Sequence, residues 1–64
     1  MDCISMKAAR IDRGMTQEEL AAAVNVTKKT VGSWENGKTR PTIDKIEAIC
    51  AVLERPYDSI RWNV

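Results

Sequence analysis

One short segment of the chain combines cationic, small and amide side chains at helical spacing. If residues 27–36 form a helix, five of them share one side, at positions i, i+1, i+4, i+5 and i+8: Lys28, Lys29, Gly32, Ser33 and Asn36. Val31 and Trp34 point to the opposite side. Lysine ammonium groups can meet guanine acceptors or phosphates, and short polar side chains can reach base edges in a major groove. The pattern indicates a DNA-facing helix; an ordinary solvated helix face is the alternative interpretation.

The distribution of charge favours the first interpretation. The net charge of the 64 residues is only +1. Between Lys28 and Arg40, however, four basic residues accompany a single acid, Glu35, while the rest of the chain has six basic and eight acidic residues. A nearly neutral protein has therefore gathered its positive charge in one segment, as binding to phosphates requires.

The composition argues against an enzyme or a metal centre. There is no histidine, and the two cysteines, Cys3 and Cys50, lie far apart in the sequence. Cys50 falls in an apolar helical pattern and is expected to be a small buried hydrophobe, whereas Cys3 is expected to be a free thiol. No apolar run approaches the length of a membrane span, and no signal-peptide pattern is visible. We expect a soluble cytoplasmic protein without enzymatic activity, metal, cofactor, membrane contact or small-molecule ligand.

The elements that must position this segment are short helices. We expect one all-α domain over residues 1–64, a compact bundle with helices at about 5–13, 17–23, 28–36, 43–53 and 57–60 and a tail at 61–64. Side chains that can cap helix amino termini precede four of them: Ser5, Thr16, Thr27 and Thr42. Gly14 and Gly37 are expected to end helices, and Asn25 to turn the chain in a left-handed conformation.

Apolar spacing predicts which residues face the core. The expected inward side chains are Met6, Ala9, Ile11, Leu20, Ala21, Val24, Val31 and Trp34, together with the stripe Ile43, Ile46, Ile49, Cys50 and Leu53. The last residues alternate between apolar and polar, which allows a short carboxy-terminal strand.

Residues Met6 to about Leu53 resemble the Xre/Cro type of helix-turn-helix domain, which occurs in phage repressors and small bacterial regulators. The resemblance rests on "ARIDRGMTQEELA", "VNVTKKTVGSWENGKTRP" and the stripe "IDKIEAICAVL". Glycine is usual in the family where Asn25 stands, and asparagine can adopt the same backbone conformation. The resemblance implies a lambda-repressor-like fold whose third helix, residues 28–36, enters the major groove.

The resemblance also implies roles for individual residues. Base-reading falls to Lys28, Lys29 and Ser33, with Gly32 allowing a close approach to the groove. Phosphate-binding falls to Gln17, Thr27, Asn36, Lys38, Arg40 and Arg10, and Gln17 would also brace the recognition helix. Because lysines stand where relatives carry glutamines, we expect a preference for guanine.

Arg10 and Glu35 match an arginine–glutamate pair that ties the first and third helices together in related repressors. We expect a partly buried structural pair, with contact between Arg10 and a phosphate secondary. The alternative is an ordinary surface ion pair, which would contribute well under about 1 kcal/mol.

The expected function is that of a sequence-specific transcriptional regulator, a repressor of bacterial or phage origin that binds a palindromic operator in double-stranded DNA as a homodimer. The tail residues Ile60, Trp62 and Val64 are the tentative dimer interface; alternatively, Ile60 and Trp62 cover the protomer's own core. The competing function is that of an antitoxin, which would bind a protein partner as well as DNA.

Overall fold

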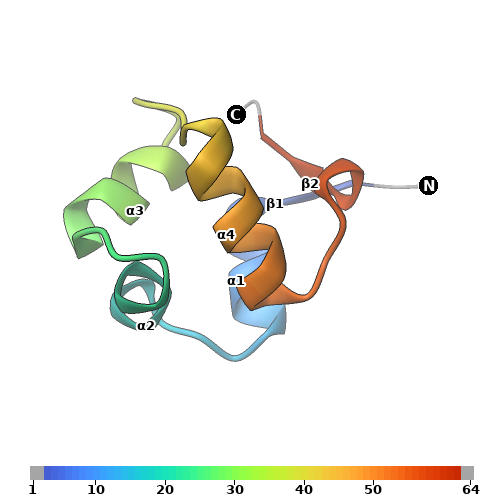
Figure 1. Ribbon diagram of the computed structural model, residues 1–64, viewed down its shortest axis with the longest axis horizontal. Helices are drawn as coiled ribbons and strands as arrows, with labels where there is room; N and C mark the ends of the chain where they lie inside the picture. The colour runs from blue at the N-terminus through green and yellow to red at the C-terminus, as the bar shows by residue number, and fades with distance from the viewer. Residues whose placement is uncertain (1–2, 63–64) are drawn as a thin grey trace.

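In the computed structural model, which describes residues 3–62, four α-helices surround one apolar core (Figure 1). In chain order the elements are β1 (Ile4–Ser5), α1 (Met6–Asp12), α2 (Gln17–Ala23), α3 (Lys28–Glu35), α4 (Ile43–Leu53), the 3₁₀ turn η1 (Tyr57–Ser59) and β2 (Ile60–Arg61). Within this part of the chain, no helix has the length and apolar character needed to cross a membrane.

Local capping signals set the helix boundaries. The side-chain oxygens of Ser5, Thr16, Thr27 and Thr42 each accept a hydrogen bond from a backbone N–H in the first turn of the helix that follows. Thr16 and Glu19 form a complete capping box, because the Glu19 carboxylate also accepts from the Thr16 N–H at 2.8 Å. The predicted bounds of α2 and α4 are confirmed, and those of α1 and α3 differ by one residue.

Left-handed residues end the helices where the sequence predicts them. Gly14 and Gly37 both have φ of +76°, and Asn25 has φ of +62°. Glu54 also lies in this region, with φ of +55°, at the end of α4. That position was not predicted, because glutamate has no preference for a conformation that glycine and asparagine adopt far more readily.

The core agrees with the prediction except at Ile11 in α1 and at three positions of the α4 stripe: Ile43, Ile46 and Cys50. Cys50, expected to be a buried hydrophobe, is only partly buried, as is Ile46, because both face an open groove beside Tyr57 rather than the core. The buried apolar residues are Met6, Ala9, Leu20, Ala21, Val24, Val31, Trp34, Ile49, Leu53 and Ile60. The prediction was wrong for Ile11, which is 56% exposed because the inner face of α1 is taken by positions 6, 9 and 10. It was also wrong for Ile43, 73% exposed at the first position of α4, beyond the edge of the core.

The fifth helix predicted at residues 57–60 is instead the single 3₁₀ turn η1. It leads into β2, which pairs in parallel with β1 so that Ile4 lies opposite Ile60 and Ser5 opposite Arg61. The alternating tail thus does form a short strand, but its partner is the amino-terminal segment of the same chain. No sequence pattern predicted β1, because a strand of two residues is too short to show a period.

Candidate nucleic-acid interface

A tight turn joins α2 to α3 and fixes the angle between them. The backbone N–H of Val26 donates to the carbonyl of Ala21 at 2.9 Å, and that of Asn25 to the carbonyl of Ala22. Leu20 and Val31, from the two helices, are fully buried beside this turn. With its inner side held in this way, α3 presents its opposite side to solvent.

The solvent side of α3 contains a shallow hollow of about 380 Å³. Its lining combines side chains from three segments: Gln17, Lys28, Lys29, Gly32, Ser33, Asn36 and Lys38. The hollow contains every residue predicted to read bases and three of those predicted to bind phosphate. Its lining has three lysines and no acid, so it offers a cationic, polar surface of the kind that DNA requires.

Gly32 and Gln17 lie next to each other in the lining of this hollow. A Cβ atom added at Gly32 would lie 4.0 Å from Nε2 of Gln17, which is ordinary van der Waals contact. The same Nε2 donates a hydrogen bond to Oε1 of Glu35 at 2.9 Å. An alanine therefore fits at position 32, whereas a longer side chain has to extend over the Gln17 amide or out into the hollow.

A buried ion pair lies beneath the hollow and joins α1 to α3. Nε of Arg10 lies 2.7 Å from Oε2 of Glu35, Nη2 lies 3.2 Å from Oε1, and Nη1 donates to the Met15 carbonyl at 2.7 Å. The two side chains are only 8% and 3% exposed, which confirms the structural pair. Since the guanidinium is already satisfied and buried, this placement does not support the phosphate contact predicted for Arg10.

Two further residues predicted to bind phosphate lie outside the hollow. Thr27 caps α3: its Oγ1 accepts from the Thr30 N–H at 3.2 Å, and the side chain remains exposed. Arg40 is also exposed, but it lines a separate hollow beside Tyr57 and Trp62. The structure therefore brings Gln17, Asn36 and Lys38 to the recognition surface, places Thr27 at the start of α3, and turns Arg40 toward another side.

Comparison with known proteins agrees with this geometry. A family model described as helix-turn-helix matches residues 6–60. The chain belongs to the Xre-like helix-turn-helix family. This helix-turn-helix domain is also 45% identical over 60 residues to the type II methyltransferase M1.ScrFI of Lactococcus lactis subsp. cremoris. The match covers 88% of this chain but only 15% of the methyltransferase, so the chain spans a small fraction of that relative's length.

Membership in the family makes this a DNA-binding domain that acts on double-stranded DNA. The hydrogen bond from Gln17 to Glu35 fits the expectation that Gln17 braces the recognition helix, but no sequence pattern predicted that Glu35 is its partner. The pairing of Glu35 with Arg10 was expected, but a carboxylate has two acceptor oxygens, and here the second one also holds the amide at the edge of the recognition surface. Within residues 3–62, no cluster of three or more potential metal ligands is present.

The tail of the helix-turn-helix domain packs on its own protomer. Ile60 is 3% exposed in the core, so its side chain is not available to a second protomer. Trp62 is half-buried; its Nε1 donates to the Tyr57 carbonyl at 2.9 Å, and its ring stacks on that of Tyr57 with centroids 5.9 Å apart. Val64 lies outside the described residues. For Ile60, the position fits the alternative that the tail covers the protomer's core.

Proposed function

We propose that the domain is a sequence-specific transcriptional regulator, a repressor, that lays α3 in the major groove of double-stranded DNA. The observation that carries this proposal is the hollow on α3, whose lining combines three lysines with Gly32 and the Gln17 amide and has no acid. Lys28 and Lys29 extend from the first turn of α3, the part of a recognition helix that reaches base edges in helix-turn-helix proteins.

The surface around the hollow leaves its lysines available to DNA. The ammonium of Lys28 lies 3.8 Å from a carboxylate oxygen of Glu18, and both side chains are well exposed. An exposed pair of this kind contributes about 0–1 kcal/mol and is readily exchanged for a phosphate or a guanine. Binding should therefore weaken steeply as salt concentration rises.

We further propose that two copies bind a palindromic operator, because one recognition helix contacts only half of a typical site and half-sites lie about 34 Å apart. The chain is proposed to contribute DNA recognition and no catalysis. The chain is similar to a stretch that makes up 15% of a type II methyltransferase. This favours a second candidate function, in which such a domain provides DNA recognition within a longer DNA-modifying protein.

The test is selection of binding sites from random duplex DNA at one fixed salt concentration, followed by affinity measurements over a range of salt. Lys29→Ala should reduce the slope of log affinity against log salt by about 1 if Lys29 meets a phosphate. If Lys29 reads a base instead, the change should relax the preference at one position of the site. Lys7→Ala, which removes an exposed lysine from α1, is the matched control and should change neither quantity.

Two results would contradict the proposal: recovery of no preferred site by the unaltered chain, or identical behaviour of the two lysine variants. A stoichiometric protein partner in a pull-down, with DNA binding that depends on it, would favour the antitoxin instead.

A further inference from the structure

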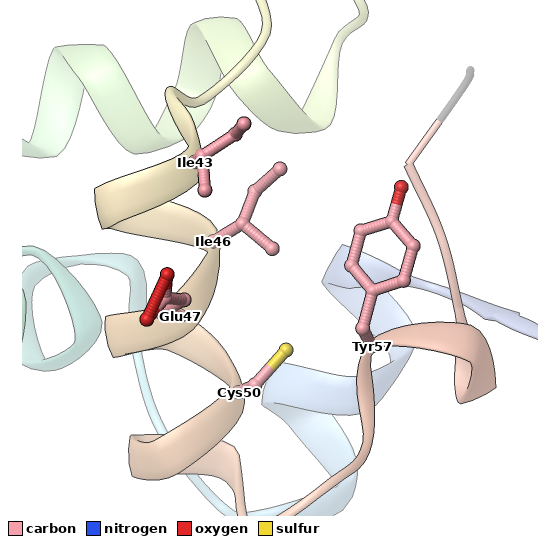
Figure 2. A pocket seen from close by; sticks show the side chains of 5 residues that line it. All are labelled: Ile43, Ile46, Glu47, Cys50 and Tyr57. Carbon is pink, nitrogen blue, oxygen red and sulfur yellow. The ribbon is translucent and has the colours of Figure 1, made fainter.

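An apolar groove of about 470 Å³ lies between α4 and η1, away from the DNA-facing hollow (Figure 2). Its lining consists of Ile43, Ile46, Glu47, Cys50 and Tyr57. Figure 2 shows the four residues of α4 along one side and the Tyr57 ring across from them. Ile43 and Tyr57 are 73% and 60% exposed, so this groove has an exposed side chain with apolar surface on each side. Adjacent exposed apolar side chains, unlike scattered single ones, are typical of interaction sites.

We propose that this groove is the contact between two copies of the chain, with Ile43 of each protomer packed into the groove of the other. The inference rests on the proposed function in one respect, because a palindromic operator requires a two-fold pair. The groove takes the place of Ile60 as the expected dimer contact, because the Ile60 side chain is buried in the core of its own protomer.

The shape of this face suits a second copy. In a two-fold dimer the same patch serves both partners, so it must carry both the projection and the recess that receives it. Ile43 provides the projection at the first position of α4, and the recess between Ile46, Cys50 and Tyr57 lies directly beside it.

The charges around the groove also suit a second copy. Glu47 lines the groove. A second hollow adjoins the groove, because Ile46 and Tyr57 line both, and its lining includes Arg40 and Asp58. A surface with both signs can meet itself, with Arg40 of one protomer near Glu47 of the other. The hollow on α3, which has lysines and no acid, would repel a copy of itself and does not offer this option.

Pairing through the groove leaves both recognition surfaces free. The groove and the hollow on α3 have no lining residue in common. The protein measures 31 Å in its longest dimension, and Figure 1 shows α2 and α3 at one end of it and η1 and β2 at the other. Two α3 helices about 34 Å apart must each lie about 17 Å from the two-fold axis. A contact on the far side of α4 from α3 is consistent with that separation.

An interface near the lower limit of size would be weak in the absence of DNA. A specific interface buries at least about 1,000 Å² in total, or about 500 Å² from each protomer. The accessible surface of one protomer is 4290 Å², so the pair would use about an eighth of it. Two half-sites on one duplex raise the effective concentration of the second copy, so that the dimer is completed on the operator.

The first test needs no DNA and uses Cys50 as a probe within the groove. In a Cys3→Ser background, the rate of Cys50 modification by a maleimide is measured at one pH over a range of protein concentrations. The rate should fall as the concentration rises, because the partner's Ile43 covers the thiol. Ile43→Asn should shift this concentration dependence at least tenfold toward higher concentration. Ile11→Asn, which alters another exposed isoleucine, on α1 and outside the groove, should leave the concentration dependence unchanged.

The second test compares a selected palindrome with a single half-site. Ile43→Asn should lose at least tenfold in affinity for the palindrome while binding the half-site normally, which also shows that the variant is folded. Protection of Cys50 without any DNA selection would support the groove while overturning the proposed function. Equal behaviour of Ile43→Asn and Ile11→Asn in both tests would overturn the groove contact. The groove contact would also be overturned if the chain stays monomeric on the palindrome while another protein occupies the groove.

Discussion

Replacing Glu35 alone should destabilise the domain more than replacing Glu35 and Arg10 together. In Glu35→Ala the Arg10 guanidinium keeps its hydrogen bond to the Met15 carbonyl but loses both contacts with carboxylate oxygens. The arginine side chain is only 8% exposed, so its charge would be left buried and unpaired. Breaking a buried pair in this way typically costs about 3–5 kcal/mol.

That cost is comparable with the whole stability of the domain. At about 0.05–0.15 kcal/mol per residue, a chain of 64 residues has roughly 3–10 kcal/mol available. Glu35→Ala should therefore lose a large share of the free energy of unfolding. In Arg10→Met with Glu35→Ala no charge stays buried, and the half-buried Met15 and Gln17 can turn their freed polar groups toward water. The double variant should lose only about 1–2 kcal/mol.

The measurement is urea unfolding followed by helical circular dichroism, for the wild type, both single variants and the double variant. The same cycle on Arg13 and Glu54, an ion pair whose side chains are 47% and 66% exposed, provides the control and should give a coupling below about 1 kcal/mol. Equal unfolding free energies for Glu35→Ala and the double variant would refute the reasoning. A coupling no larger than that of the exposed pair would refute it as well.

Three further predictions concern single positions. Gly32→Ala should stabilise the fold by about 1 kcal/mol in thermal unfolding, because alanine favours a helix interior and fits at this position. Gly32→Gln should weaken DNA binding or change the preferred site, because the longer side chain occupies the hollow beside Gln17. An unchanged site and affinity for Gly32→Gln would contradict the close approach of Gly32 to DNA. Ile60→Ala should cost about 2–5 kcal/mol in urea unfolding, and a loss under about 1 kcal/mol would be inconsistent with its burial. Glu54→Gly should raise the free energy of unfolding in urea by up to about 1 kcal/mol, because glycine adopts the left-handed conformation at this position without strain. The loss of the exposed ion pair with Arg13 subtracts a small amount from that gain. Glu54→Ala keeps a strained left-handed residue and should show no gain.

The sequence predicts the helices of this domain well because their ends depend on residues close in the chain. A capping side chain acts on an N–H three residues away, as Thr16 does on Glu19, and a left-handed turn depends mainly on the residue that adopts it, as at Asn25. The positions of Lys28 and Lys29 on one helix face follow from the same local periodicity. These features need no knowledge of the rest of the fold.

What the sequence could not predict depends on which elements meet in space. Period alone places Ile43 on the same stripe as Ile49, but the core ends before the first turn of α4, so one is exposed and the other buried. Similarly, nothing local shows that Ile4 pairs with Ile60. The orientation of Arg40 away from α3 also depends on how the loop before α4 is placed against Tyr57.

The parallel pairing of β1 with β2 has a consequence for the order in which the domain forms. Contacts between α2 and α3 close short loops, whereas the pairing of Ile4 with Ile60 closes a loop that contains nearly the whole described chain. Because closing a long loop costs more conformational entropy, the strand pair should form after the helices and be the first part to open. Amide hydrogens of β1 should then exchange with solvent at a lower opening free energy than those of α2 and α3, so that the recognition helix keeps its shape through fluctuations that separate the two strands.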